Sequence, residues 1–397
     1  MKILLYTPYL PSDKNSGGLM TRQMCQVLSD RGHEICIVAA STRRAQILLS
    51  SKLKKLVHKE FYRINDIVIP NNWLFSKFLN RLINWLQELY LNFIINPQVI
   101  SFARKNRVDC IWSILQGKSM IVSTWNIVRK LNIPLVTQVW DDPNWVLMNS
   151  GLDLVVQKDL FKKFDYLIAS SQVCATASWQ MSKQYEKKYK VKTIPIVAPG
   201  DKKLSKKFRK MNVRQIHIAL AGQLYAQTEW QALVQALSNQ NWFVLGKPVK
   251  LHLFGHFLKN DFNKDLPIEL HSYKSQTKLI ELLSDMDICY CPYWFDRSFE
   301  AVAKTSFPSK ITSYLVSGRP VLFHGPKYAS PAVFIEENGC GVCCYSLESQ
   351  DIIKAIEAII QSPAEYKKLV KNGRQAFLKY LTLNNFESSV KELFSFK

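Results

Sequence analysis

Short apolar segments alternate with amphipathic segments along most of the chain. An apolar run at 2–7 precedes a loop at 8–18 that is rich in Pro, Ser, Asp, Asn and Gly. Apolar positions at helical spacing follow, up to Arg31 and Gly32, and a second apolar run occupies 34–40. This order predicts a strand, a crossover helix and a second strand, the unit from which a parallel sheet is built.

The same alternation continues to about residue 200 and then starts again. The first series predicts strands at 108–114, 135–139, 166–169 and 192–197, with helices at 119–131, 152–164 and 172–185. The second predicts strands at 216–221, 249–254, 268–270, 288–291 and 321–323, with helices at 230–237, 276–284 and 309–316. The polar, basic stretch 199–210 between them lacks periodicity and predicts an interdomain linker. Residues 352–396 predict helices only.

Two such series predict the α/β fold class, with two Rossmann-like domains that face each other across a cleft and C-terminal helices. The boundaries that we expect are 1–200 for the first domain and 201–375 for the second. The remaining segment, 376–397, is expected to be a helix that packs back on the first domain.

Residues 43–107 differ from the rest because basic and large apolar side chains interleave there. The members are Arg43, Arg44, Lys52, Lys54, Lys55, Lys59, Trp73, Phe75, Lys77, Phe78, Leu79, Arg81, Leu82, Ile83, Trp85, Leu86, Leu89, Tyr90 and Phe93. One interpretation is a helix that lies on an anionic lipid surface. The commoner interpretation of such a stripe is a core-facing helix with solvated lysines. The sequence leaves both open.

The net charge of the chain limits the classes of partner that we expect it to bind. The 397 residues carry a formal net charge of +22, which favours an acidic partner: nucleic acid, an anionic membrane or a phosphate-bearing substrate. No helix-turn-helix, zinc-finger or RNA-binding motif is present, so we expect no nucleic acid. The first apolar run is too short for a signal peptide and is followed by Pro8 and Pro11, and no window has the length of a membrane span. We therefore expect a cytoplasmic location.

Nine cysteines are present, an odd number that does not indicate a secreted disulfide scaffold. Cys340, Cys343 and Cys344 cluster, but no second CxxC or HxxxH element accompanies them. This pattern predicts buried, reduced thiols rather than a zinc site.

The segment 307–321 carries a family resemblance. It reads FPSKITSYLVSGRPV, a short helix opened by Pro308, Ser309 and Lys310 and followed by a Gly-x-Pro-Val turn. Upstream, Asp287 precedes an apolar strand that ends in proline, and downstream Glu336 and Glu337 precede a Gly-x-Gly element at 339–341. In this order the three elements resemble the GT-B glycosyltransferases, in particular those of family 4. The resemblance covers almost the whole chain and implies an N-terminal acceptor-binding domain and a C-terminal domain that binds a nucleotide-sugar donor.

The chain departs from the family pattern at several positions. Thr305 and Ser313 stand where the family has paired glutamates, and no basic residue is found near Thr228. The usual histidine of the N-terminal domain is absent, with Gln116 near its place. Trp140 and Asp141 stand in place of a His-Asp pair. These losses keep open a catalytically inactive GT-B relative that acts as a binding or scaffold subunit.

The candidate site follows from the resemblance and from phosphate chemistry. Lys310 near a helix N-terminus is the leading cation for the leaving diphosphate, because the helix dipole and a compact ammonium both favour negative charge. The other donor-site candidates are Gly17, Gly18, Gly222, Arg297, Lys304, Pro308, Ser309 and Ser313. Tyr9, Trp140, Trp145 and Tyr225 are candidates for stacking on sugar or base, or for packing.

Asp141 and Asp142 follow a predicted strand and have two interpretations. As catalytic candidates they would orient the acceptor hydroxyl or the donor sugar. As Asp-Asp-Pro-Asn they are equally good turn chemistry.

The resemblance implies a retaining transfer without a metal or other cofactor, in which the leaving phosphate takes the acceptor's proton. The expected substrates are a nucleotide-diphosphate sugar and a glycan or lipid-linked acceptor, in cell-surface polysaccharide or glycolipid synthesis. With residues 43–107 on an anionic membrane, the protein would be peripheral on the inner face of the cell membrane. A nucleotide-sugar epimerase of the same fold would need a glutamate-histidine constellation, which the sequence does not place.

Overall fold

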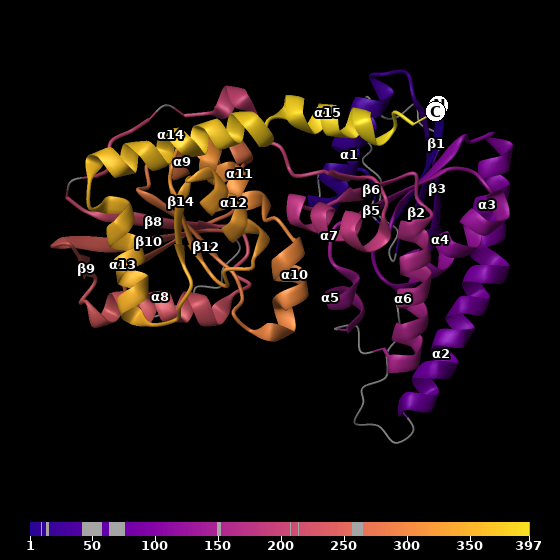
Figure 1. The fold of residues 1–397 in the computed structure, drawn as a ribbon, viewed down its shortest axis with the longest axis horizontal. Helices are drawn as coiled ribbons and strands as arrows, with labels where there is room; N and C mark the ends of the chain where they lie inside the picture. The colour runs from indigo at the N-terminus through magenta and orange to yellow at the C-terminus, as the bar shows by residue number, and fades with distance from the viewer. Residues whose placement is uncertain are drawn as a thin grey trace. The chain divides into compact units, whose positions relative to one another are not determined.

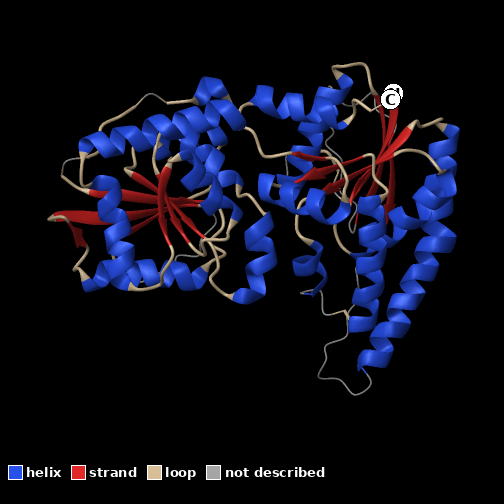
Figure 2. Cartoon of the chain, in the orientation of Figure 1, coloured by secondary structure: helices blue, strands red, loops and turns tan. Residues whose placement is uncertain are grey.

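The computed structural model describes residues 1–8, 10–12, 16–41, 58–62, 76–148, 152–206, 208–212, 214–255 and 265–396 (Figure 1). The chain divides into two compact units. The first is Met1–Ile196 with Glu387–Lys397, and the second is Val197–Phe386. In each unit a sheet lies between helices (Figure 2), which confirms the predicted α/β class. In the structure the boundaries lie at Ile196 and Glu387, whereas the sequence predicted them at 200 and 376.

The sheet of the first unit is parallel, in the order β3-β2-β1-β4-β5-β6-β7. Its strands are β1 Lys2–Thr7, β2 Glu34–Ser41, β3 His58–Tyr62, β4 Cys110–Ile114, β5 Leu135–Val139, β6 Val173–Thr176 and β7 Thr193–Pro195. β4, β5 and β6 are buried at every position, as expected of strands covered on both faces. The strand order reverses between β1 and β4, and such a switch point is where open α/β sheets bind ligands.

The helices of the first unit are α1 Ser16–Ser29, α2 Ser76–Tyr90, the π-helix η1 Leu91–Ile95, α3 Asn96–Lys105, α4 Lys118–Leu131, α5 Pro143–Met148, α6 Leu154–Ala169 and α7 Trp179–Tyr189. α15, Leu383–Leu393, begins in the second unit and ends in the first. Within the first unit, the Phe394 ring packs edge-on against Trp112 at 5.6 Å between centroids. Lys192 and Glu392 also form an ion pair of 2.8 Å between Nζ and Oε1.

The strand predicted at 166–169 is wrong, because these residues are the last turn of α6. The side chain of Asp153 caps that helix by accepting a hydrogen bond from the Val155 amide. Phe164, Leu167 and Ile168 are buried at helical spacing, so the apolar run belongs to one face of a helix. The strand lies at Val173–Thr176 instead, inside the helix predicted at 172–185.

The sheet of the second unit has the order β11-β10-β8-β12-β13-β14. Its strands are β8 Ile216–Ala221, β9 Phe243–Val244, β10 Lys247–Phe254, β11 Ile268–His271, β12 Ile288–Pro292, β13 Val321–His324 and β14 Gly341–Cys344, and β9 pairs antiparallel with β10. The other pairings are parallel. Here the strand order reverses between β8 and β12, which is the second switch point.

The helices of the second unit are η2 Lys202–Leu204, α8 Gln227–Asn239, α9 Gln276–Leu283, η4 Arg297–Phe299, α10 Glu300–Thr305, α11 Ser309–Val316, α12 Ser330–Asn338, α13 Ser349–Ile360 and α14 Pro363–Tyr380, followed by the start of α15. Residues 352–396, predicted to be helical only, contain α13, α14 and α15. Tyr290, Leu322 and Ile356 are among the buried side chains of the core.

The start of the predicted linker packs on the second unit. The Gly200 amide donates to the Leu381 carbonyl at 2.8 Å, and the Lys206 amide donates to the Val316 carbonyl at 2.9 Å. A Cβ at Gly200 would meet Val316 at 2.7 Å. The segment resembles a linker in sequence because it is polar and lacks periodicity, while its backbone makes the contacts.

Candidate functional site

The loop after β8 lies at the switch point of the second unit. Gly222 ends the strand with a φ of +82°, a backbone conformation that favours glycine. Its amide donates to the Phe254 carbonyl at 2.8 Å, and a Cβ built there would meet no atom within 4 Å. The surface at this strand end is therefore open, and a ligand can approach the backbone closely.

Lys310, in the first turn of α11, reaches across to this loop. Its Nζ donates to the Gln223 carbonyl at 3.1 Å and lies 4.5 Å from the centroid of the Tyr225 ring. The side chain is half-buried, and its loss of hydration lowers the pKa of the ammonium to about 8. The partner is a neutral carbonyl, so the cation retains its charge for a ligand.

The N-terminus of α11 lies beside this cation. Pro308 is the N-cap residue, and Ser309 is exposed at the first helical position. The first amides of a helix lack intrahelical partners and attract anions. Ser313, one turn further on, is half-buried. The structure thus brings Gly222, Ser309 and Lys310 to one end of the sheet.

Glu229 holds the neighbouring loop after β12, and no motif in the sequence indicated this role. Its carboxylate, 2% exposed, accepts a hydrogen bond from the Phe295 amide at 2.7 Å. Burial raises the pKa of Glu229, and the amide donor opposes that rise. The indole N–H of Trp294 donates to the Tyr225 carbonyl at 2.9 Å. These bonds fix the β12 loop against the residue over which Lys310 lies.

Arg297, Lys304 and Thr305 belong to η4 and α10, which follow that loop. The Lys304 ammonium is paired with Glu300 and lies 5.1 Å from the centroid of the Tyr328 ring. The Thr305 hydroxyl donates to the Ala301 carbonyl at 2.7 Å. Arg297 is exposed. Lys304 thus has an acidic partner of its own, whereas the Lys310 ammonium donates to a neutral carbonyl.

In the first unit, Gln116 and Asp141 meet at the ends of β4 and β5. The Gln116 amide donates from Nε2 to Asp141 Oδ2 at 3.2 Å. Burial, together with the charge of Asp142, raises the pKa of the Asp141 carboxyl. Gln116 stands near the place where the family pattern has a histidine, so the structure joins one position at which this chain departs from that pattern to the aspartate of the Trp140-Asp141 pair.

Asp142 has the geometry of a turn residue. It is 2% exposed, and its Oδ1 accepts hydrogen bonds from the Asn144 amide at 2.9 Å and from Asn144 Nδ2 at 2.7 Å. Its carbonyl accepts from the amides of Trp145 and Val146. The carboxylate therefore starts α5, which supports the turn interpretation for Asp142 and leaves Asp141 as the acidic candidate.

Gly17 and Gly18 lie in the first turn of α1, after β1. The Gly17 carbonyl accepts from the Thr21 hydroxyl at 2.7 Å, and the Gly18 carbonyl accepts from the Ser12 amide at 3.1 Å. The second bond holds Ser12 against the start of the helix. Tyr9, a candidate for stacking, lies outside the described residues.

The cysteines are free thiols, as predicted. Burial raises the pKa of Cys340 and Cys343 to about 12, so these thiols stay protonated near neutral pH. Among the residues that the structure describes, the one group with metal-ligand geometry is His252, Glu269 and His271, which no sequence pattern indicated.

The comparisons with known proteins identify the fold. No model of a protein family and no curated protein sequence matches the chain. Solved structures do match over the full length. Sucrose-phosphate synthase from Thermosynechococcus elongatus is 12% identical with a TM-score of 0.67, over 99% of this chain and 98% of its own.

Two other solved structures are similar to the chain over its full length. A glycosyltransferase from Rickettsia africae is 14% identical, with a TM-score of 0.64 over 100% of this chain and 99% of its own. HepE of Anabaena in complex with UDP is 14% identical, with a TM-score of 0.66 over 100% of both chains. With two Rossmann-like units and neighbours of this class, the chain has the GT-B glycosyltransferase fold.

Proposed function

We propose that this protein is a glycosyltransferase that takes a sugar from a nucleotide-diphosphate donor bound at the second unit. The observation that carries the proposal is Lys310, a cation at a helix N-terminus, placed over the glycine-containing loop at a switch point. Helix amides and a fixed ammonium favour the charge that grows on a departing diphosphate. HepE of Anabaena, of the same fold, has been solved with UDP and with UDP-glucose, which makes uridine nucleotides the first donors to test.

We assign the residues around this cation to separate tasks. Gly222 allows the donor to approach the backbone, and Pro308 and Ser309 present the first amides of α11. Ser313 on the same helix is assigned to the donor ribose. Arg297 and Lys304 are assigned to the outer part of the donor, because both are exposed.

The N-terminal unit is proposed to bind the acceptor, a glycan or a lipid-linked sugar, and Gly17 and Gly18 stay candidates for donor binding. Asp141, held by Gln116, orients the acceptor hydroxyl. The resemblance of segment 307–321 supports a retaining transfer in which the leaving phosphate accepts the proton of the acceptor hydroxyl. No metal is assigned to this chemistry.

Thermal unfolding in a panel of nucleotide diphosphates and nucleotide sugars tests the proposal. A ligand that binds only the folded state stabilises it by about 2.7 kcal/mol at a hundredfold excess over its Kd. We expect one nucleotide class to raise Tm. The sugar of the corresponding nucleotide sugar should then be transferred to a lipid-linked acceptor, and NMR shows the anomeric configuration of the product. Binding without turnover would favour the inactive relative, and no shift with any nucleotide would remove the donor-site assignment.

We further propose that α2 and η1 place the protein on an anionic membrane surface. Three of their polar side chains, Asn80, Asn84 and Gln87, are buried, and the Lys118 ammonium donates to the last two. Leu91 and Ile95 of η1 are buried, but six large apolar side chains of the two helices are 41–73% exposed, namely Phe78, Leu82, Trp85, Leu86, Phe93 and Ile94. An outward apolar stripe of this kind is typical of an interaction surface.

The net charge of +22 favours anionic lipid as the occupant of that stripe. Among the described residues, no helix is long and apolar enough to cross a bilayer. Of the basic and aromatic residues predicted for this region, Arg43, Arg44, Lys52, Lys54, Lys55, Trp73 and Phe75 lie outside the described residues, and Lys59 lies in β3.

The triple variant Phe78→Ser, Trp85→Ser and Phe93→Ser should lose vesicle binding, since each aromatic ring contributes about 1.5–3 kcal/mol when it is buried. Sedimentation with phosphatidylglycerol vesicles at low salt measures it, and a decrease in affinity of more than tenfold is expected. Tyr273→Ser, which removes a 69% exposed aromatic ring from the second unit, is the control. Equal binding by wild type and triple variant would remove α2 from the membrane assignment.

A further inference from the structure

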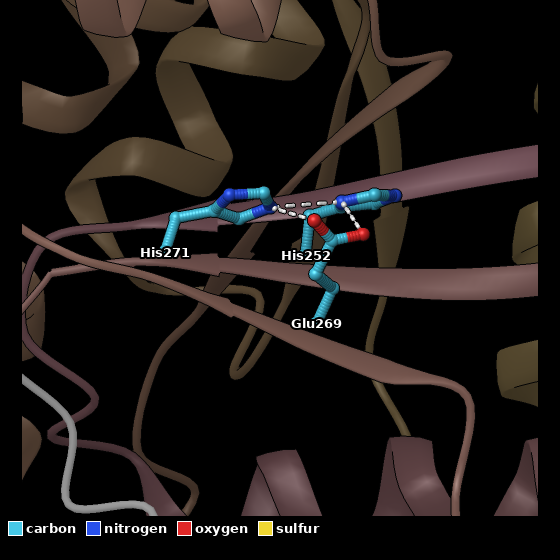
Figure 3. Close-up of side chains that lie close together, drawn as sticks. All are labelled: His252, Glu269 and His271. Atoms are coloured by element: carbon cyan, nitrogen blue, oxygen red, sulfur yellow. Dashed lines mark hydrogen bonds and ion pairs between the residues drawn. The ribbon is translucent and has the colours of Figure 1, made fainter.

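Three ligating side chains meet on one face of the second unit's sheet. His252 lies on β10, while Glu269 and His271 lie on the neighbouring edge strand β11. In the parallel register His252 pairs with Glu269, and residues two apart on a strand share a face. Figure 3 shows the three side chains directed toward one another.

The distances between these side chains fit a shared ion. His252 Nδ1 lies 3.1 Å from His271 Nε2. Glu269 Oε2 lies 3.7 Å from His252 Nδ1, and Glu269 Oε1 lies 3.6 Å from His271 Nε2. Ligand atoms at about 2.0–2.1 Å from a tetrahedral zinc ion lie about 3.3–3.4 Å from one another. The observed separations bracket that value, so an ion fits with small side-chain movements.

Neighbouring groups hold the ligands in orientation. His217 on β8 faces the other side of the His252 ring, with 2.9 Å between His217 Nδ1 and His252 Nε2. If Nδ1 of His252 binds a metal, its Nε2 carries the proton and donates to His217. Such an outer partner is typical of metal-bound histidine. The Lys250 ammonium pairs with Glu269 at 2.8 Å, and the Phe254 ring stacks on His271 at 4.2 Å between centroids.

The two sides of the cluster differ in burial. The His252 side chain is 6% exposed, whereas that of Glu269 is 44% exposed. The cluster therefore opens to water on the carboxylate side, from which an ion enters.

We propose that His252, Glu269 and His271 form a binding site for one divalent transition-metal ion, with zinc as the best fit and water in the fourth position. Two imidazoles and a carboxylate are the ligands that zinc takes in sites with an open position. The ion joins the edge strand β11 to β10. The site shares no residue with the proposed donor site and does not depend on it.

Titration of the chelator-treated full-length protein with Zn²⁺, followed by calorimetry, tests the site. One ion per chain is expected. His271→Gln and Glu269→Gln should each weaken binding by at least tenfold, since even loss of an outer-shell partner costs about 10–100-fold in affinity. His33→Gln, which removes a half-buried imidazole from the first unit, is the matched control and should bind as wild type does.

Co²⁺ identifies the ligands independently of affinity. Its visible absorption should report nitrogen and oxygen ligands in the wild type and should decrease in the two site variants. A thiolate-to-cobalt band would place the ion on cysteines and overturn the assignment, as would no binding or equal Zn²⁺ affinity in wild type and variants. Nucleotide-induced thermal shifts should persist in both site variants. Their persistence shows folded protein and separates failure of the metal site from failure of the donor site.

Discussion

Lys310→Met is expected to weaken the binding of the nucleotide diphosphate by about 10–100-fold, because a hydrogen bond to a charged group contributes about 1.5–3 kcal/mol. The effect on kcat/KM should be larger, about 10²–10³-fold, since charge on the leaving diphosphate grows in the transition state. Methionine preserves most of the side-chain stem that lies over Tyr225. The loss would therefore report the charge rather than a cavity.

Isothermal titration with the nucleotide chosen from the thermal panel, and initial rates with its sugar nucleotide, measure these effects. Lys278→Met is the matched control, because Lys278 is an exposed lysine of the same unit that pairs with Glu281. It should bind and turn over as wild type does. If Lys310→Met binds the nucleotide as tightly as wild type, Lys310 is not the diphosphate cation.

The pH dependence gives a second test of the same residue. The protonated ammonium binds the diphosphate, and its pKa in the free protein is lowered to about 8. Below that value the cation is already present. Above it, binding must take up a proton, so the affinity should fall by up to tenfold per pH unit. The fall should be absent in Lys310→Met, whose affinity is weak at all these pH values.

The strand-helix alternation was sufficient to predict the fold because it depends on apolar periodicity alone. The strands at 135–139 and 216–221 and the helix at 309–316 have the predicted bounds. The prediction failed at 166–169, where four apolar residues fit the end of a buried helix as well as a strand. Phe164, Leu167 and Ile168 are buried at helical spacing and continue α6 to Ala169, but four residues are too few to show that spacing in the sequence.

The site was less predictable because it depends on contacts between distant segments. Asp141 and Asp142 are adjacent in sequence and chemically identical, and they are distinguished by their hydrogen bonds, from Gln116 to Asp141 and from Asn144 to Asp142. Glu229 is one acidic residue at a helix start, yet it anchors a loop from another strand. The apolar stripe at 76–90 was enough to predict a helix, but it did not show whether the apolar face points to the core or to solvent. The hydrogen bond between Lys118 of α4 and Asn84 of α2 turns the polar face inward, and such a contact between separate helices is not visible in the sequence.

Gly341→Ala is expected to destabilise the second unit by about 3 kcal/mol, near the upper end for forcing an extra carbon into a packed site. Gly341 opens β14 opposite Val321 of β13. A Cβ there would lie 2.0 Å from the Val321 carbonyl oxygen, which is backbone and cannot turn aside. The second glycine of the Gly-x-Gly element that suggested a family resemblance is therefore required for strand pairing.

Gly339→Ala should cost only about 1 kcal/mol, the strain of a positive φ for alanine. Gly339 ends α12 with a φ of +54°, and its nearest neighbour beyond the adjacent residues is the flexible Asn372 amide at 3.0 Å. Thermal and urea unfolding, followed by tryptophan fluorescence, compare the two variants. With about 2–4 °C per kcal/mol for a unit of this size, Gly341→Ala should melt about 6–12 °C below wild type. A Gly341→Ala variant as stable as Gly339→Ala would mean that β14 can move away from Val321, so that the edge of this sheet is not fixed by close backbone contact.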